Sequence, residues 1–300
     1  MSALERELRA RFDARLQREY PLAELTSFRI GGPADLYLLV EDEDELGAAV
    51  AAAQRHSVPS FCLGSGTNLL VSDRGIRGLV IKLGAGFAQV ELDGCDLRAG
   101  AAAQFGALAR MTAERGLAGL EFGEGIPGSV GGGLLMNAGA FGGELACVVT
   151  AVRGGDANGQ VRMLTKPEVG FAYRRTALPP RFIITRVDCT LVRGDREALR
   201  ARVAEIHAKR MSRQPDGVPN AGSVFKNPPG SFAGRLLEAA GLKGARRGGA
   251  AFSTRHANFI VNLGGARAGD VHALIELARA RVRASAGVAL EPEVRLVGEW

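Results

Sequence analysis

The stretch GEGIPGSVGGGLLMNAGAFGG, Gly123 to Gly143, decides the fold, because it is rich in glycine, almost uncharged and still apolar. It contains G-x-G-x-x-G at Gly123, Gly125 and Gly128, the spacing of the Rossmann dinucleotide fingerprint. That fingerprint needs a buried strand before the glycines and a continuous helix after them. Here the preceding segment is short and broken by glycine, and Pro127 removes an amide from the motif. Three further glycines follow, each costing a helix about 1 kcal/mol. The pattern is therefore not a Rossmann fingerprint.

A flexible linker is excluded as well, because Leu134, Leu135 and Met136 give the stretch a character that favours burial. The remaining interpretation is a backbone surface that a large, flat group approaches closely, where side chains would be in the way. A second glycine loop, Leu63–Gly78, begins with GSGTN and combines free backbone with short polar side chains. This composition is typical of an anion-binding nest for a pyrophosphate. Taken alone, either loop also fits a tight structural turn.

Length and composition limit the class of protein. The chain has 300 residues, enough for two domains, and 46% of them are hydrophobic. No apolar run reaches the ~18 residues needed to span a bilayer, and no secretory signal opens the chain, so we expect a cytoplasmic protein without membrane insertion. The net charge of +6 is spread along the sequence and fits nucleic acid or an anionic small molecule. The four cysteines, Cys62, Cys95, Cys147 and Cys189, are far apart, and no two histidines have the spacing of metal ligands. We therefore expect no metal site and no disulfide.

Hydrophobic periodicity predicts an α+β chain of two domains. The first domain comprises residues 1–194, with two subdomains that divide near residue 84. In it we expect an amphipathic helix within residues 1–20 and a hairpin that turns at Asp93-Gly94. We also expect strands at 34–41, 59–64, 78–83 and 182–192 and helices at 44–56 and 101–115. The second domain, residues 195–300, opens with an amphipathic helix that is capped by Asp195 and ends before Pro215. We then expect strands at 222–227, 257–262 and 293–298 and helices at 232–242 and 270–285.

Seven ordered motifs carry a resemblance. They are TSFRIGGPAD (26–35), GSGTNLLV (64–71), the stretch around Gly123–Gly143, FAYRRT (171–176), NAGSVFKNP (220–228), HANFIVN (256–262) and LEPEVRLVG (290–298). Through these motifs together, the chain resembles the UDP-N-acetylenolpyruvoylglucosamine reductase (MurB) family of peptidoglycan precursor synthesis, over residues 26–298. The resemblance implies an FAD-binding domain of the vanillyl-alcohol-oxidase (PCMH) type, followed by a smaller α+β substrate-binding domain. No tyrosine follows Tyr173, which indicates the shorter type II subgroup, without a tyrosine-bearing loop in the C-terminal domain.

The resemblance also implies an activity: NADPH-dependent reduction of UDP-N-acetylglucosamine enolpyruvate to UDP-N-acetylmuramate through non-covalent FAD, in cell-wall biogenesis that serves cell shape and cell division. It implies a cytoplasmic enzyme, and we expect a monomer. An alternative is another FAD-dependent oxidase or dehydrogenase on the same fold. A third hypothesis, a basic nucleic-acid-binding protein, needs a clustered basic face with interleaved aromatic residues. Aromatic residues make up only 6% of the chain, so we expect no nucleic-acid partner.

Three residues match the catalytic set of the family. Arg174 would hold the substrate carboxylate and stabilise the enolate, because a guanidinium binds a carboxylate through two parallel hydrogen bonds. Ser223 would donate the proton to C2, and Glu293 would act with the arginine. From the residues alone, Arg174 also fits a surface arginine, Ser223 a turn serine and Glu293 a salt-bridge partner of Arg295. Glu291, two residues away, shares a strand face with Glu293, and only the motif distinguishes the two.

The resemblance assigns the remaining site residues in two groups. The FAD-binding residues are Gly64, Ser65, Gly66, Thr67, Asn68, Leu69, Gly125, Ile126, Pro127, Gly128, Ser129, Gly131, Gly132, Asn137 and Ala138. The substrate-binding residues are Tyr173, Arg213, Lys226 and Asn227. Glu124 departs from the family pattern, which has a small residue there. Its carboxylate would either disfavour the anionic reduced flavin or point to solvent.

Overall fold

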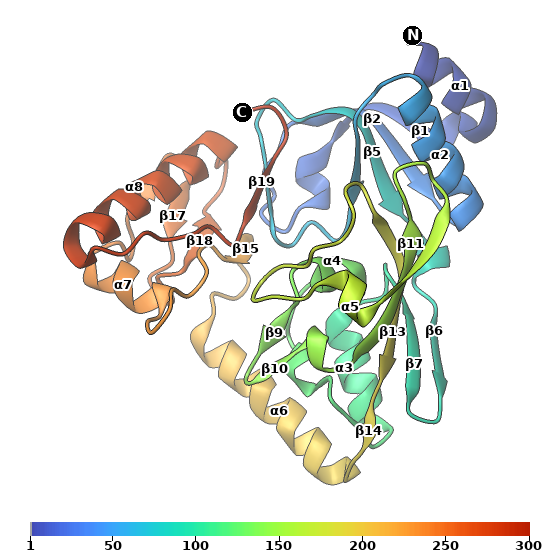
Figure 1. The fold of residues 1–300 in the computed structure, drawn as a ribbon. Coiled ribbons are helices and arrows are strands. Elements are labelled where there is room, and N and C mark those ends of the chain that lie inside the picture. Colours follow the sequence, from blue (N-terminus) through green and yellow to red (C-terminus); the bar gives the residue numbers. More distant parts are fainter. Residues whose placement is uncertain (1) are drawn as a thin grey trace. The chain divides into compact units, whose positions relative to one another are not determined.

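The computed structural model describes residues 2–300 and divides into two compact units (Figure 1). The first unit comprises the chain up to Arg18, Leu36–Ser65 and Gly78–Arg210. The second comprises Glu19–Asp35, Gly66–Arg77 and Met211–Trp300. The mixture of helices and strands confirms the predicted α+β class. The predicted functional boundary at residue 195 stays a prediction, because compactness does not reveal which part binds which ligand.

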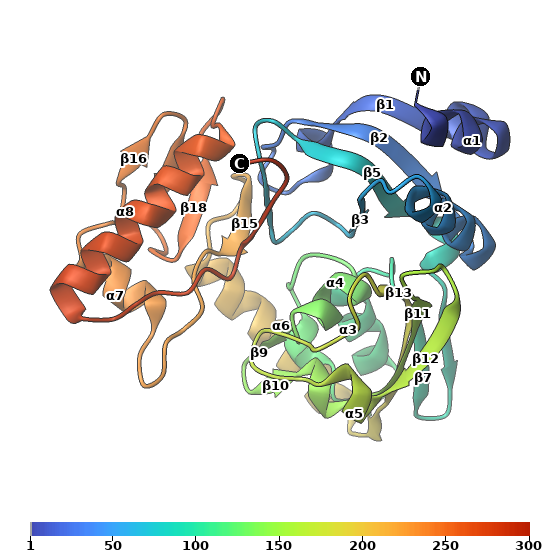
Figure 2. The same cartoon turned by 45° about the horizontal axis from the view of Figure 1, so that its top comes forward.

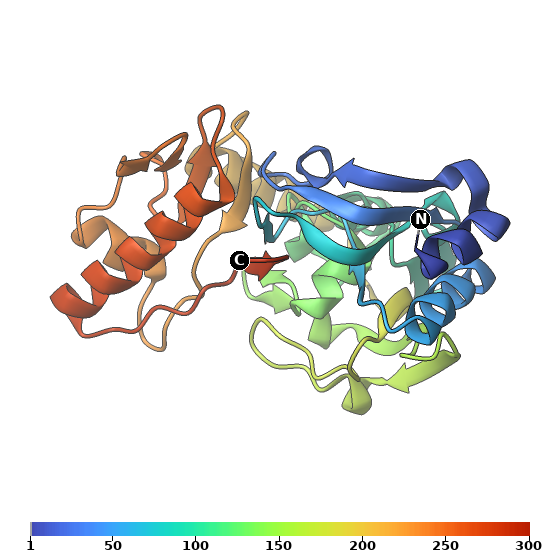
Figure 3. The same ribbon diagram turned by 90° about the horizontal axis from the view of Figure 1, so that it is seen from above.

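The N-terminal part of the first unit is a sheet covered by two helices. The sheet has the order β1-β2-β5-β3, with β1 Leu16–Pro21, β2 Pro33–Val40, β5 Ile76–Leu83 and β3 Ser60–Leu63, and the unit boundary crosses β1, β2 and β5. The helices α1 (Ala3–Phe12) and α2 (Glu43–Arg55) contact each other and lie against this sheet (Figure 3). The prediction of helix up to residue 20 is wrong after Phe12. Asp13 takes a left-handed φ of 44°, and the chain turns into β1.

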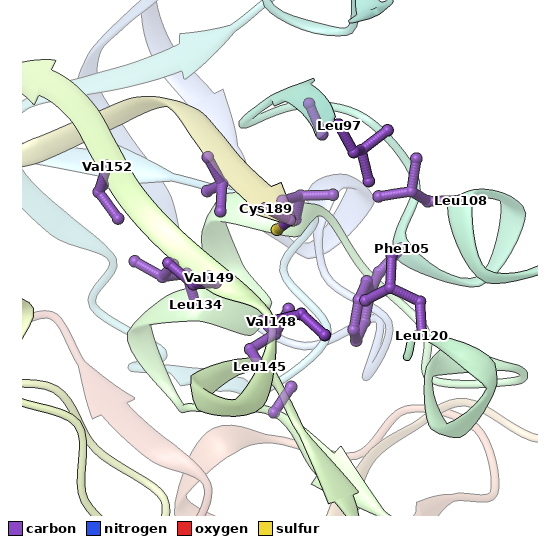
Figure 4. Close-up of a cluster of buried hydrophobic side chains, with 14 of the residues drawn as sticks. Leu97, Phe105, Leu108, Leu120, Leu134, Leu145, Val148, Val149, Val152 and Cys189 are labelled. Carbon is purple, nitrogen blue, oxygen red and sulfur yellow. The ribbon is translucent and has the colours of Figure 1, made fainter. Parts of the chain in front are cut away.

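A second, antiparallel sheet forms the rest of the first unit, in the order β12-β11-β13-β7-β6. Its strands are β6 Val90–Asp93, β7 Asp96–Gly100, β11 Val149–Gly155, β12 Val161–Thr165 and β13 Ile183–Thr190. Asp93 pairs with Asp96, which confirms the predicted hairpin. Helix α3 (Phe105–Glu114) and short α4 (Val130–Leu135) supply side chains to the core beneath this sheet, where Phe105, Leu134 and Cys189 meet (Figure 4).

Short elements complete the first unit: β8 Leu117–Ala118, β9 Gly139–Ala140, β10 Gly143–Glu144, α5 Lys166–Val169 and β14 Val192–Arg193. Within the glycine-rich stretch, α4 is only six residues long, and Ser129 caps it by accepting a hydrogen bond from Gly132 N at 3.4 Å. Gly131 packs so closely that an added Cβ would lie 2.9 Å from Ala101 Cβ. Of the three apolar residues that favoured burial, Leu134 is fully buried, while Leu135 and Met136 are partly buried.

Helix α6 (Arg196–Arg213) begins where the sequence predicts, because the Asp195 carboxylate accepts the amide hydrogen bond of Ala198 at 2.8 Å. Its last three residues belong to the second unit. None of the helices within residues 2–300 combines the length and the apolarity needed to cross a membrane.

The second unit has a sheet in the order β15-β18-β17-β16 and helices α7 and α8 (Figure 2). The bounds are β15 Asn220–Ser223, α7 Ala233–Ala239, β16 Arg246–Arg247, β17 Ala250–Phe252, β18 Phe259–Asn262 and α8 Ala268–Ala286. Helix α8 packs on β16 and β17. Its buried side chains belong to one hydrophobic core, which also contains Phe28, Leu70 and Phe225 from other segments of the unit. A parallel pair, β4 (Leu69–Val71) with β19 (Arg295–Val297), completes the unit. The predicted strand at 222–227 ends early, at Ser223.

Candidate flavin and substrate site

Arg174 lies at the tip of a tight turn in the first unit. Ala172 and Arg175 exchange backbone hydrogen bonds of 3.0 and 3.2 Å, and Arg174 between them has a left-handed φ of 55°. A non-glycine residue in this conformation costs about 1–2 kcal/mol, and such strain is found preferentially at functional sites. The guanidinium donates from Nη2 to Gly139 O at 2.8 Å and lies 5.3 Å from the ring centre of Tyr173. The turn therefore aims Arg174 at the glycine-rich stretch.

Two further hydrogen bonds tie this turn to the same stretch. The buried Asn137 donates from Nδ2 to Ala172 O at 3.2 Å, while its Oδ1 accepts from Ala146 N at 2.9 Å. Thr176 donates from its hydroxyl to Leu135 O at 3.3 Å. The structure thus brings the predicted catalytic arginine and the predicted flavin-binding stretch together. Since both polar atoms of Asn137 bond to backbone, this side chain positions the turn.

The two glycine loops also meet within the first unit. A Cβ added at Gly64 would lie 3.3 Å from Ser129 Oγ, and one added at Gly132 would lie 3.4 Å from the same oxygen. For both positions this hydroxyl is the nearest atom outside the local backbone. The remaining predicted residues of the stretch belong to the same segment: Gly125, Ile126, Pro127, Gly128, Gly131 and Ala138. Two glycines, Gly64 of one loop and Gly132 of the other, therefore lie next to the hydroxyl of the buried Ser129.

In the second unit, Ser223 and Glu293 come together through the backbone. Ser223 ends β15, where it pairs with Phe259, and Glu293 N donates to the neighbouring Val224 O at 2.7 Å. The predicted cofactor residue Asn68 joins them, because its Nδ2 donates to Glu293 O at 3.1 Å and its own carbonyl accepts from Arg295 N at 3.0 Å. Hydrogen bonds between neighbouring segments thus hold together Ser223, the proton-donor candidate, Glu293 and Asn68 of the GSGTN loop.

The end of that loop is fixed by close packing. Gly66 has a φ of 65°, and a Cβ there would lie 2.1 Å from Leu25 O, so only glycine fits. Ser27 N donates to Gly66 O at 3.1 Å, and Leu69 pairs with Arg295 at the start of β4. Thr67 lies between these anchors. The loop crosses from the first unit, with Gly64 and Ser65, into the second.

The predicted substrate residues differ in their surroundings. Lys226 is largely buried and forms an ion pair with Glu291, whose own side chain is exposed. Glu291 is therefore engaged as the partner of Lys226. Asn227 accepts at Oδ1 from Ala233 N at 3.0 Å, at the start of α7. Arg213, the last residue of α6, and Tyr173 are both exposed.

Comparison with known proteins identifies the family. The FAD binding domain family matches residues 34–165, and the family of the UDP-N-acetylenolpyruvoylglucosamine reductase C-terminal domain matches residues 214–297. A UDP-N-acetylenolpyruvoylglucosamine reductase of Rubrobacter xylanophilus is 48% identical, over 96% of this chain and 99% of its own. One from Symbiobacterium thermophilum is 46% identical, over 99% and 98%. The chain belongs to the UDP-N-acetylenolpyruvoylglucosamine reductase family.

A solved structure agrees with this assignment. The MurB reductase of Thermus caldophilus superimposes with a TM-score of 0.82 at 39% identity, over 94% of this chain and 98% of that one. A berberine bridge enzyme variant, 16% identical with a TM-score of 0.50 over 64% of this chain and 44% of its own, shares the fold alone. The chain is thus an FAD-dependent oxidoreductase of the MurB family, with the predicted PCMH-type domain and MurB C-terminal domain. Within residues 2–300, no group of His, Cys, Asp and Glu side chains is arranged to hold a metal ion.

The departure of this MurB sequence at position 124 has a structural explanation. Glu124 is only 2% exposed, which rules out the second of the two alternatives, that it points to solvent. Its carboxylate accepts from Arg110 Nη1 at 2.8 Å and lies 3.0 Å from His207 Nδ1. The buried carboxylate therefore has two basic partners that lie outside the glycine-rich stretch.

A third basic residue, Arg210, was missed by the sequence analysis. Its side chain packs across Gly125, where a Cβ would lie 2.6 Å from Arg210 Cδ. Burial lowers the pKa of Arg210, the Glu124 carboxylate opposes this change, and Arg174 lowers the pKa further. The buried Arg210 Nε has no hydrogen-bond partner within residues 2–300. The signal was present in α6, because buried Ile206 lies one helical turn before Arg210.

These features fit an FAD molecule at the glycine loops of this MurB protein. Gly64 and Gly132 offer backbone without a side chain, which allows close approach of a flat ring or a pyrophosphate. Arg210 contributes a half-buried cation with an unsatisfied donor beside Gly125. A desolvated guanidinium is stabilised by an anionic group. The residues present therefore suit an anionic, planar cofactor and an anionic substrate.

Proposed function

We propose that this chain reduces UDP-N-acetylglucosamine enolpyruvate to UDP-N-acetylmuramate, with NADPH as co-substrate and non-covalently bound FAD, in peptidoglycan precursor synthesis. Membership of the MurB family supports the substrate and the reaction. The observation that carries the proposal is the strained Arg174 turn, which is held against the glycine-rich stretch by Gly139, Asn137 and Thr176. A catalytic role of the guanidinium would explain why Arg174 keeps this strained backbone conformation.

Arg174 and Glu293 act on the carboxylate of the enolpyruvyl group. The planar guanidinium binds a carboxylate bidentately and stays charged at every accessible pH. Negative charge moves towards this carboxylate as the enol ether is reduced, so a fixed cation stabilises the transition state more than the ground state. The hydrogen bond from Nη2 to Gly139 O fixes the guanidinium before substrate arrives. Glu293, held through its backbone by Val224 and Asn68, assists at the developing enolate.

Ser223 supplies the proton to C2. A serine hydroxyl is a weak acid, so positive charge near it must stabilise the alkoxide that forms when the proton leaves. Lys226, three residues further on, provides such charge on the same segment, with Glu291 as its partner when substrate is absent. The position of Ser223 is set by its pairing with Phe259 at the end of β15. The backbone of Ser223 is thus placed by a strand.

The remaining assigned residues bind cofactor and substrate. When bound, FAD would supply the hydride transfer between NADPH and the enolpyruvyl group. Gly64–Leu69 would hold the pyrophosphate of FAD, and the stretch from Gly125 to Ala138 would line the flavin. Tyr173, Arg213, Lys226 and Asn227 would bind the UDP-sugar, whose diphosphate suits basic residues.

An anaerobic experiment tests the proposal. The purified protein, which should be yellow and release FAD on denaturation, is reduced with NADPH, and UDP-N-acetylglucosamine enolpyruvate is then added. Rapid return of the oxidised flavin spectrum supports both half-reactions and the substrate together. A flavin that stays reduced until air is admitted would instead favour an oxidase on the same fold. A colourless protein that takes up no FAD would contradict the proposal at its root.

A further inference from the structure

Lys82 lies at the edge of the sheet where the GSGTN loop begins. It is the penultimate residue of β5 and pairs in parallel register with Leu63, the last residue of β3. Its ammonium donates to the carbonyl oxygen of Gly64, the first residue after β3. All three residues belong to the first unit. The lysine therefore reaches over the carboxyl ends of two parallel strands, which is where α/β sheets bind their ligands.

Lys82 has no carboxylate partner among the residues that the structure describes. Its side chain is half-buried. Its neighbour Cys62 stays a neutral thiol, because burial raises the pKa of Cys62 to about 12. Burial also lowers the pKa of Lys82. The contrast is Lys226, a similarly enclosed lysine that does have a carboxylate partner, Glu291.

A lysine ammonium has three donors, and the structure gives Lys82 one acceptor, the Gly64 carbonyl. Removing a cation from water is unfavourable unless an anion or several hydrogen bonds compensate. Within residues 2–300, the Gly64 carbonyl is the one acceptor that this partly buried ammonium has. The adjacent Gly64 and Ser65 open the loop whose composition suits an anion. The anion that Lys82 lacks would thus be delivered beside it by a bound ligand.

We propose that Lys82 is an FAD-binding residue whose ammonium contacts a phosphate oxygen of the FAD pyrophosphate. The inference rests on the proposed role of Gly64–Leu69 as the pyrophosphate loop. The hydrogen bond to the Gly64 carbonyl points the ammonium at the start of that loop before the cofactor binds. A lysine acts on phosphate as a point charge, so its contribution depends on charge more than on geometry.

The test measures FAD affinity and stability rather than turnover. Apoprotein is prepared from wild type, Lys82→Met and Lys82→Arg, and FAD is titrated by flavin fluorescence at several NaCl concentrations. Arg77→Met is the matched control. It removes one positive charge from the other end of β5, where Arg77 pairs with Asp35 at 2.7 Å. We expect about 10- to 100-fold weaker FAD binding for Lys82→Met, the range for one charge-assisted hydrogen bond. We expect recovery to within about 10-fold for Lys82→Arg, and no change for Arg77→Met.

Two accompanying readouts separate cofactor binding from loop support. The affinity of Lys82→Met should depend less steeply on salt than that of wild type, because one ionic contact is missing. The melting temperature of its apoprotein should not fall, while the increase that FAD produces should be smaller than in wild type. Wild-type FAD affinity in Lys82→Met would overturn the inference. So would a weaker affinity with an unchanged salt dependence and a less stable apoprotein, since this is what loss of the Gly64 bond alone would cause. If wild type itself binds no FAD, the proposed function fails instead.

Discussion

Two buried asparagines hold the two catalytic segments, and they do so in different ways. Asn137 in the first unit bonds the Arg174 turn, and Asn258 in the second bonds the segment after Ser223. Asn137 connects two separate pieces of chain, Ala172 and Ala146, and has a left-handed φ of 41°. Asn258 instead directs both polar atoms at Phe225, accepting from its N–H at 3.0 Å and donating to its carbonyl at 2.8 Å.

The difference lies in what each asparagine replaces. Asn258 acts as a substitute strand partner, continuing the pairing of β15 past Ser223, while its own carbonyl accepts from Val224 N at 2.8 Å. Asn137 acts as a tie between loops, and both it and Arg174 have left-handed backbones. We infer that Ser223 itself owes its position to backbone pairing, whereas the Arg174 turn is tied to the glycine-rich stretch by side-chain bonds, one of them from Arg174. Replacing Ser223 should therefore affect chemistry alone, and replacing Arg174 should affect chemistry together with geometry.

Ser223→Ala should have the largest effect. Loss of the proton donor should slow reoxidation of the reduced flavin by substrate about 10²- to 10⁴-fold. Reduction by NADPH and the melting temperature should remain near wild type, because the backbone pairing of β15 does not involve the hydroxyl. Stopped-flow absorbance of each half-reaction checks this. Equal loss in both half-reactions would remove Ser223 from the donor role and would break the proposed division between the two segments.

Arg174→Lys should follow, with a loss of about 10²- to 10³-fold in kcat/KM, comparable to removal of one oxyanion donor. Lysine keeps the charge but loses the bidentate fork and the geometry of the bond to Gly139. The matched control is Arg175→Lys, at the exposed neighbouring position of the same turn. Steady-state kinetics of both variants decide the matter. Near-wild-type turnover in Arg174→Lys would mean that the arginine supports the turn and takes no part in catalysis.

Asn258→Ala should be the more destabilising of the two asparagine substitutions. It leaves the N–H and the carbonyl of fully buried Phe225 without partners, which should cost about 2–4 kcal/mol in the free energy of unfolding. Denaturant unfolding of the apoprotein measures the change. Asn258→Asp retains one acceptor and should fall between wild type and alanine. An alanine variant as stable as wild type would show that the segment after Ser223 needs no substitute strand partner.

Asn137 offers a sharper test, because two substitutions separate strain from hydrogen bonding. Alanine and glycine both remove the bonds to Ala172 and Ala146, but only glycine tolerates a φ of 41° without cost. We expect Asn137→Gly to lose about 1–2 kcal/mol and Asn137→Ala about 1 kcal/mol more. Activity should fall in both, since the Arg174 turn loses its tie. Equal stability of the two variants would contradict the role of backbone conformation at this position.

Regular elements were predictable from the sequence where local signals decide them. The helix expected at 44–56 is α2, the hairpin at Asp93-Gly94 is β6–β7, and Asp195 caps α6 as its side chain predicts. Errors arise where tertiary contacts override periodicity. Helical character continues in the sequence up to residue 20, yet the helix ends at Phe12 and Leu16–Pro21 pairs as β1. The strand expected at 222–227 stops at Ser223 because Asn258, far along the chain, takes over the hydrogen bonds of Phe225.

The site divides in the same way. The motifs place Arg174, Ser223 and Glu293 in the sequence, and their roles remain predictions. The residues that surround them depend on spatial neighbours that no local pattern encodes. Lys82 is notable only because β3 and β5 pair in one register, and Arg210 only because α6 crosses Gly125. The partners of Glu124 are Arg110 from α3 and His207 from α6, and His207 lies 83 residues after Glu124 in the chain.

The smallest expected effect concerns His256, which links Asn258 to pH. Its Nδ1 accepts the amide hydrogen bond of Asn258 at 3.1 Å, an interaction that protonation of Nδ1 would abolish. Burial lowers the pKa of His256, so the unfolded chain takes up a proton before the folded one does. The stabilisation is therefore present above the ordinary histidine value of about 6.5 and is lost as the pH falls towards the lower folded pKa. The unfolding free energy at pH 7.5, 6.5 and 5.5 should fall by up to about 1 kcal/mol more in wild type than in His256→Gln, which does not titrate. Parallel pH profiles for the two proteins would show that the Asn258 partnership in the second unit is independent of this histidine.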